Sequence, residues 1–314
     1  MVLVGNSMLE INNVKTVLDK VFKIKDLGSL RYFLGLEIAR SKSGIDMNQR
    51  KYALSLLEDA GTLASKPAST PFDPTVKLQL QKGTHIYDIS SYRRLVGRLL
   101  YLTISRPDLS YALHQLSLFM CNPLDSHYKA AQPVLRYLKG SLAQGLFLSS
   151  TSPIHFSAFS DSDWACCLDS RKSITGFCIF MGSALISWKT KKQNIVSRSS
   201  SEAEYRALGS LVCELQWLKY LFTDLHIPQS NPISVYCDNK STIHLAQNPI
   251  FHERMKHIEI DCHVVLEKIQ QKLVHLLPIS SSSQLANAFT KPLRASTFKS
   301  FVSKLGLCNI HRPT

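Results

Sequence analysis

The sequence predicts an α/β protein whose mixed sheet is flanked by helices. Three short strand-like segments follow one another closely at residues 155–160, 173–181 and 184–189, as expected for a meander of antiparallel strands. A long helical pattern follows at 202–222, where leucines recur at helical spacing. Beyond it, strand-like and helical segments alternate, which is typical of a sheet with helices packed on it.

Upstream, residues 1–64 predict a small mixed unit. An amphipathic helix is expected at 14–22, because the apolar residues there share one helical face. Two strand-like segments, 32–39 and 44–48, are separated by a turn, and a second helix is expected at 52–60.

Residues 65–150 are expected to form a linker followed by a helical connection region. Pro67, Pro71 and Pro74 stand among small polar residues, a composition typical of linkers. Residues 90–139 then carry leucines at helical spacing. The basic residues on these helices are Arg93, Arg94, Arg98, Arg106, Lys129, Arg136 and Lys139. Such charges are ordinarily solvated, and contact with phosphates is the functional alternative.

After the long helix, the pattern alternates between the two kinds of element. Strands are predicted at 233–237 and 273–279, and helices at 241–247, 253–271 and 284–291. This element order is that of a ribonuclease H fold: three meander strands, a helix, a strand, helices, a strand and a last helix. Because one fold can host many functions, this order predicts the architecture but not the activity.

The composition bounds the partners and the compartment. Lys and Arg number 37 against 23 Asp and Glu, a net charge of +14, which is typical of nucleic-acid-binding proteins but also fits a merely basic soluble protein. The eight cysteines contain no Cys-x-x-Cys pair and favour free thiols in a reducing compartment. No apolar stretch is long enough to cross a bilayer, and the N-terminus lacks a signal-peptide pattern. We therefore expect an intracellular protein, cytoplasmic or nuclear, that is neither secreted nor bound to a membrane.

Three carboxylates stand at the ends of predicted elements. Asp161 ends the first strand of the meander, Glu204 opens the long helix, and Asp238 ends the strand 233–237. Each has an ordinary structural explanation: Asp161 as a turn residue, Glu204 in a capping box with Ser201, and Asp238 as a helix N-cap.

Together, the three carboxylates favour a catalytic explanation. In a ribonuclease H fold these element ends converge, and carboxylates that meet there repel one another unless cations neutralise them. Hard oxygen ligands suit Mg²⁺ or Mn²⁺. Two such ions can activate a water and stabilise the leaving oxygen of a phosphodiester.

Several stretches resemble the C-terminal part of copia-type retrotransposon Pol polyproteins. In the second half these are SDSDWA at 160–165, SSSEAEYRA at 199–207, VYCDN at 235–239 and LANAFTKPL at 285–293. Upstream, motifs such as FKIKDLG at 22–28, YFLGLE at 32–37, LVGRLLY at 95–101 and VLRYLKG at 134–140 resemble the end of the family's reverse transcriptase region.

The resemblance implies a domain order and an activity. It implies a truncated reverse transcriptase palm remnant at 1–64, a connection region at 65–150, a ribonuclease H-like domain at 153–293 and a tail at 294–314. In the family, Asp161, Glu204 and Asp238 would be metal-binding catalytic residues of an endonuclease that hydrolyses the RNA strand of RNA–DNA hybrids. Other segments of the polyprotein are expected partners.

Two departures from the family pattern bear on this activity. The family's polymerase site contains two adjacent aspartates, and this sequence has no Asp-Asp pair, so polymerase activity is not expected from this polypeptide. The family usually has a fourth metal-binding aspartate in the last helix, where this chain has Asn287. Two hypotheses follow: a ribonuclease weakened by Asn287, and a non-catalytic nucleic-acid-binding remnant of a decayed element.

Overall fold

The computed structural model describes residues 1–314 except 228, 230, 249–258 and 310–314. Within the described residues the strands form two five-stranded sheets. The larger sheet has the order β7-β6-β5-β8-β9, in which β5 pairs antiparallel with β6 and β6 with β7, while β8 is parallel to β5 and β9 to β8. This is the strand order of a ribonuclease H fold, and it confirms the predicted fold class. The strands are β5 (Phe156–Asp163), β6 (Ile174–Met181), β7 (Ala184–Lys192), β8 (Ile233–Cys237) and β9 (Val274–Pro278).

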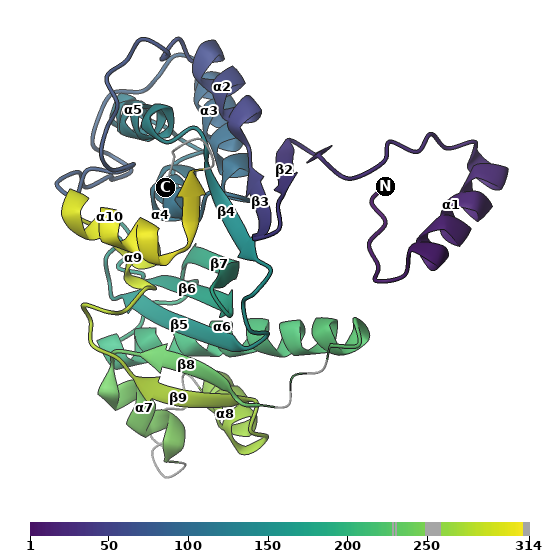
Figure 1. The fold of residues 1–314 in the computed structure, drawn as a ribbon. Helices are drawn as coiled ribbons and strands as arrows, with labels where there is room; N and C mark the ends of the chain where they lie inside the picture. Colours follow the sequence, from purple (N-terminus) through teal and green to yellow (C-terminus); the bar gives the residue numbers. More distant parts are fainter. Residues whose placement is uncertain (228, 230, 249–258, 310–314) are drawn as a thin grey trace.

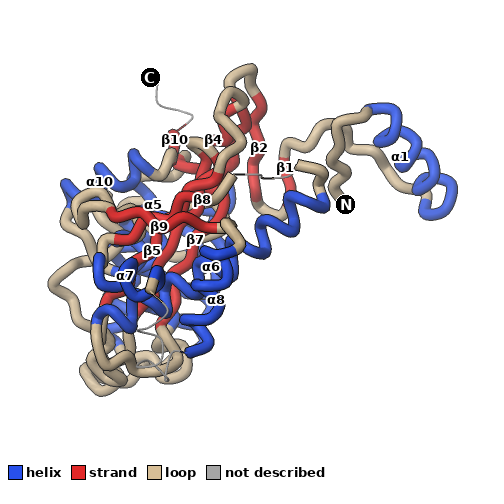
Figure 2. Tube along the Cα trace, turned by 90° about the horizontal axis from the view of Figure 1, so that it is seen from below, coloured by secondary structure: helices blue, strands red, loops and turns tan. Residues whose placement is uncertain are grey.

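Helices cover both faces of this sheet (Figures 1 and 2). Strand β6 shows the alternation: Phe177 and Ile179 join the core under α6 (Ser200–Asp224), whereas Cys178 and Phe180 face the other way. The α6 side also carries α7 (Lys240–Gln247) and α8 (Glu259–Gln270). The predicted start of that last helix, at 253, lies outside the described residues. The opposite face packs against α9 (Asn287–Thr290) and α10 (Ala295–Lys304).

The smaller sheet joins segments from the two ends of the chain. Its order is β1-β2-β3-β4-β10, and every pairing is antiparallel. The predicted strand at 44–48 is confirmed as β3, whereas β4, β10 and α10 were not expected from the sequence. Figure 2 shows β10 beside β4. The other strands are β1 (Tyr32–Phe33), β2 (Leu36–Arg40), β4 (Gln144–Ser149) and β10 (Leu307–Asn309).

The first helix, α1 (Met8–Phe22), begins six residues before the predicted start and lies apart from the rest of the chain in both views (Figures 1 and 2). None of its residues is buried. Several of its apolar side chains, Val17, Val21 and Phe22 among them, are more than 60% exposed. None of the helices in the described part of the chain combines the length and apolar character needed to span a bilayer.

The helical connection region packs around its own core. It comprises α2 (Arg50–Asp59), α3 (Ile89–Leu102), a 3₁₀ turn (Pro107–Leu109), α4 (Ser110–Ser117) and α5 (Asp125–Gly140). The predicted linker follows an irregular path, but Phe72 is buried and Lys139 and Arg136 donate to the carbonyls of Ser65 and Lys66.

Most of the basic residues on these helices, for which a solvated face and a phosphate contact were the two alternatives, have internal partners. Arg98 pairs with Asp59, Lys129 with Asp125, and Arg93 donates to backbone carbonyls after α4. Neither alternative holds for Arg106, which is 2% exposed. Its guanidinium makes a two-pronged contact with Asp108 at 2.9 and 2.7 Å, and Asp108 also accepts from the Tyr137 hydroxyl.

We predict that Arg106→Met costs roughly 3–5 kcal/mol of unfolding free energy, because it leaves the buried Asp108 charge without its partner. Arg98→Met makes the same replacement in an exposed pair and should cost less than about 1 kcal/mol. Urea unfolding followed by circular dichroism measures both. Equal losses in the two variants would contradict a dominant role for the buried pair.

Candidate metal-binding carboxylate site

Asp161 lies within β5, the central strand of the larger sheet, and is 1% exposed. The explanation of Asp161 as a turn residue is therefore wrong. Its carboxylate accepts a hydrogen bond from the Thr290 hydroxyl and contacts the Lys291 ammonium at 3.3 Å. Burial raises the pKa of Asp161 and Asp238 adds to this, while Lys291 and Thr290 act in the opposite direction.

Close packing in this part of the sheet depends on Gly176, the β6 residue paired with Asp161. A Cβ at this position would lie 2.6 Å from the Thr290 side chain and 2.8 Å from that of Phe289. Only glycine leaves room for α9 to approach the sheet so closely. The glycine thereby allows Thr290 to reach Asp161.

Glu204 lies in the first turns of α6 and does not cap the helix. The N-cap is Ser199, which accepts from the backbone N–H of Glu202, while the Glu202 carboxylate accepts from the N–H of Arg198 at 2.7 Å. The expected capping box of Ser201 and Glu204 is therefore wrong, because the helix starts two residues earlier. Capping by Ser199 and Glu202 leaves Glu204 available for another role.

The Glu204 side chain is 7% exposed, and its Oε2 has no hydrogen-bond partner among the described residues. Burial, together with the charges of Asp161 and Asp238, raises the pKa of Glu204 to about 9. The two aspartates are thus close enough to act on Glu204 electrostatically, although the three come from separate segments.

Asp238 follows β8, and the expected N-cap role falls to its neighbour. Asn239 caps α7 by accepting from the N–H of Thr242 at 3.0 Å. Asp238 instead accepts from the Ser281 hydroxyl at 2.7 Å. Oxygen atoms of Glu204 and Asp238 and the sulfur of Cys237 all lie within 4.8 Å of one another.

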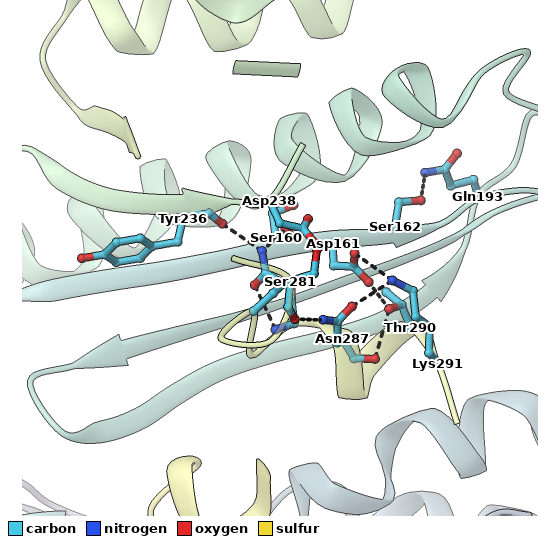
Figure 3. A network of polar contacts seen from close by, with 12 residues as sticks. Ser160, Asp161, Ser162, Gln193, Tyr236, Asp238, Ser281, Asn287, Thr290 and Lys291 are labelled. Carbon is cyan, nitrogen blue, oxygen red and sulfur yellow. Dashed lines mark hydrogen bonds and ion pairs between the residues drawn. The ribbon is translucent and has the colours of Figure 1, made fainter. Parts of the chain in front are cut away.

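Asn287 begins α9 and is connected to Asp161 through Lys291 (Figure 3). The Lys291 ammonium donates to the amide oxygen of Asn287 at 2.8 Å and also contacts Asp161. The Asn287 amide nitrogen donates to the carbonyl of Ser281 at 2.8 Å. Burial lowers the pKa of Lys291, but the surrounding carboxylates outweigh burial and raise it overall.

Sequence reasoning did not single out the residues that hold this arrangement together. Lys291 and Thr290 contact Asp161, and Gln284 donates to the carbonyls of Ser160 at 3.0 Å and Tyr236 at 3.4 Å. Gln284 thereby fixes the last loop to both β5 and β8. The available signals were the family-like motif at 285–293, which contains Thr290 and Lys291, and the i,i+4 spacing of Asn287 and Lys291.

The residues present fit a divalent cation. Glu204 and Asp238 lie within 4.8 Å of each other, Asp161 is near enough to raise the pKa of Glu204, and one oxygen of Glu204 has no partner in the described part of the chain. A single ammonium, that of Lys291, offsets part of their charge. Oxygen ligands of this kind suit Mg²⁺ or Mn²⁺.

A basic cavity lies between β7 with the loop that follows it, α6 and α8. It measures about 280 Å³, and its cationic lining comes from Lys189, Lys191, Lys192 and Arg206, against the single carboxylate of Asp261. Gln193 forms part of the wall, and its amide nitrogen contacts the Ser162 hydroxyl and the Ala203 carbonyl. None of the three carboxylates lines this cavity, and its relation to them is indirect, because Ser162 and Ala203 are the chain neighbours of Asp161 and Glu204.

Comparison with known proteins places these features in context. Residues 1–74 match the family model described as reverse transcriptase (RNA-dependent DNA polymerase). The chain is 40% identical over 306 residues to the retrovirus-related Pol polyprotein from transposon RE1 of Arabidopsis thaliana, which covers 98% of this chain and 21% of that polyprotein. It is 44% identical over 216 residues to the uncharacterized mitochondrial protein AtMg00810 of the same plant, covering 68% of this chain and 89% of the relative. The chain thus spans about a fifth of the length of the Pol polyprotein it matches.

Among solved structures, the foamy viral protease-reverse transcriptase in complex with RNA/DNA hybrid aligns with a TM-score of 0.45 and 12% identity. The alignment covers 89% of this chain and 34% of that one. The fold assignment does not use this alignment. It rests on the strand order and pairing of the larger sheet.

We predict that the protein becomes less stable in EDTA as the pH rises from about 5 to 9. In this window Glu204 keeps a proton in the folded state that it releases on unfolding, because its folded pKa of about 9 exceeds the ordinary value of 4.5. Glu204→Gln should remove most of this pH dependence and stabilise the protein at pH 8 by roughly 2–4 kcal/mol. Thermal unfolding across the pH range measures both. An unchanged pH profile in Glu204→Gln would show that another group is responsible.

Proposed function

Because this chain belongs to the Pol polyproteins of copia-type retrotransposons, we propose that its ribonuclease H-like domain hydrolyses the RNA strand of RNA–DNA hybrids at the carboxylate site. The observation that carries the proposal is that Glu204 and Asp238, from separate segments, lie within 4.8 Å of each other and within electrostatic reach of Asp161, with one buried Glu204 oxygen lacking a partner in the described residues. The RNA strand is distinguished by its 2′-hydroxyl, which serves as a recognition handle.

The protein side chains hold and orient the reacting groups. Glu204 and Asp238 present oxygens toward one point, and Asp161 is fixed by Thr290 and Lys291. When bound, Mg²⁺ or Mn²⁺ would activate the attacking water and stabilise the leaving oxygen. The Ser281 hydroxyl holds Asp238, and Gln284 holds the backbone beside Asp161, so the carboxylates are oriented before substrate arrives.

We propose that Asn287 lowers the affinity of this site for cations. An aspartate at this position would add a negative charge close to Asp161 and would pair with Lys291 more strongly than the amide does. With asparagine, the Lys291 ammonium is shared between a neutral amide and Asp161. Lower cation affinity and slower hydrolysis follow.

The second candidate is a non-catalytic nucleic-acid-binding remnant. The neutral Asn287 and the contact of Lys291 with Asp161 favour it, because both reduce the attraction of the site for cations. In either case, we propose that the lysines of the basic cavity contact a phosphate backbone.

We also propose that the chain is divided as the family order implies, with other polyprotein segments as partners. The ranges are 1–64 for the reverse transcriptase remnant, 65–150 for the connection, 153–293 for the ribonuclease H-like domain and 294–314 for the tail. Strands β4 and β10, from the second and fourth of these ranges, complete the sheet begun in the first.

We predict that the natural chain cleaves a labelled RNA–DNA hybrid slowly in Mg²⁺, and that Asn287→Asp cleaves it at least about tenfold faster, because a restored ligand charge is worth more than about 1.4 kcal/mol. Asp238→Asn should be inactive. Gel analysis of the labelled RNA strand gives the rates, and duplex DNA of the same sequence is the substrate control.

The outcomes separate the two candidates. If Asn287→Asp gains nothing over a cleaving natural chain, the account of the fourth position fails. If all three proteins are inactive yet bind the hybrid with a steep salt dependence, the non-catalytic candidate is correct.

The cavity yields a prediction about binding that does not depend on cleavage. Lys191→Ala/Lys192→Ala should weaken hybrid binding and reduce the slope of log affinity against log salt by about one for each lysine that contacts a phosphate. Lys129→Ala, which removes an exposed lysine of α5 that pairs with Asp125, should leave the slope unchanged. Fluorescence anisotropy over a salt series measures both, and equal slopes in the two variants would exclude the cavity as a contact.

A further inference from the structure

The proposed hydrolysis uses oxygen ligands and leaves Cys237 without a role. Cys237 is the last residue of β8 and directly precedes Asp238. It is 1% exposed and belongs to the core beneath α6. Its sulfur nevertheless lies within 4.8 Å of ligand oxygens of Glu204 and Asp238.

A second observation indicates that these atoms face a ligand. The Glu204 side chain is more than nine-tenths buried, and its Oε2 has no partner among the described residues. The Cys237 thiol makes a weak hydrogen bond to the carbonyl of Asn239, at 3.8 Å. A partnerless carboxylate oxygen thus lies beside a weakly engaged thiol in a place largely closed to water.

We propose that Glu204, Cys237 and Asp238 form a site for a thiophilic divalent cation such as Zn²⁺ or Cd²⁺. Thiolate sulfur selects such ions, whereas Mg²⁺ prefers oxygen alone. As the metal–sulfur bond forms, the thiol releases its proton to solvent and no electron transfer is required. The inference rests on the proposed function only because the two sites share Glu204 and Asp238.

The spacing of the three side chains supports tetrahedral binding. Ligand atoms around a tetrahedral zinc ion lie roughly 3.3–3.7 Å apart, as zinc–sulfur and zinc–oxygen bond lengths require. Because the ligand atoms here lie at most 4.8 Å apart, they need to approach one another by at most about 1.5 Å, which side-chain rotation can supply. An ion held in this way occupies Glu204 and Asp238, so it competes with Mg²⁺ for these two ligands.

Cadmium titration of the full chain tests the site directly, because a cadmium–thiolate bond has its own ultraviolet charge-transfer absorption. Adjacent Cys166 and Cys167 are replaced by serine in every protein used, since their neighbouring thiols could also bind the ion. In this background, Cys237→Ala should lose the absorption and bind Cd²⁺ at least about tenfold more weakly, because losing a ligand costs more than losing an outer-shell partner. Cys178→Ala, which removes another buried cysteine of the same sheet, should keep both.

Absorption and affinity that are the same in Cys237→Ala and Cys178→Ala would overturn the inference. Cys237→Ser, which keeps the size of the side chain but removes sulfur, decides the question if the alanine variant does not fold. Thermal unfolding establishes folding in each case.

A nuclease arm separates this inference from the proposed function. If the hybrid is cleaved, Zn²⁺ should inhibit cleavage in the Cys178→Ala protein at a concentration at least about tenfold lower than in the Cys237→Ala protein. Equal inhibition would overturn the inference while leaving the nuclease proposal intact. If no protein cleaves the hybrid, loss of the cadmium absorption in Cys237→Ala still supports the site, and only the proposed function fails.

Discussion

Repulsion among three acidic side chains is the constraint around which this part of the protein is organised. Asp161, Glu204 and Asp238 come from β5, α6 and the end of β8, and burial makes their charges costly. Neighbouring groups offset that cost unequally: Thr290 and Lys291 contact Asp161, and Ser281 contacts Asp238. Burial, and after it the charges of Asp161 and Asp238, raise the pKa of Glu204 to about 9, and its Oε2 has no partner among the described residues. An arrangement of this kind favours a positive ion over an empty pocket.

The segment that relieves this repulsion is the last part of the chain, far in sequence from the strands it stabilises. Gln284 fixes the loop before α9 to β5 and β8. Helix α9 then approaches over Gly176, where a side chain would block it, and brings Thr290 and Lys291 to Asp161. Helix α10 continues the contact by burying Phe301 against the same face of the sheet. The geometry of the carboxylates therefore depends on packing by residues that do not themselves carry the proposed chemistry.

Sequence patterns were informative wherever a local rule sets the structure. Sequence patterns located β6, β8 and α6, because β6 is buried on both faces and β8 and α6 each bury one face. They failed for β4 and β10, which are strands only because each finds a partner far away in sequence. The cap of α6 was misplaced because several serines precede Glu204, and only the hydrogen bonds identify Ser199 as the cap. The sequence also did not reveal the role of Arg106, because it does not distinguish an arginine in a buried ion pair from an arginine in solvent.

The pairing of β10 with β4 also bears on the order in which the protein can fold during synthesis. Strand β4 is completed early and pairs with β3 on one edge, while the residues that cover its other edge leave the ribosome long afterwards. Until then, β4 presents unpaired backbone groups, the usual starting point for wrong associations between chains. The larger sheet, α9 and α10 are all translated in this interval. The pairing of β10 with β4 therefore forms late in synthesis.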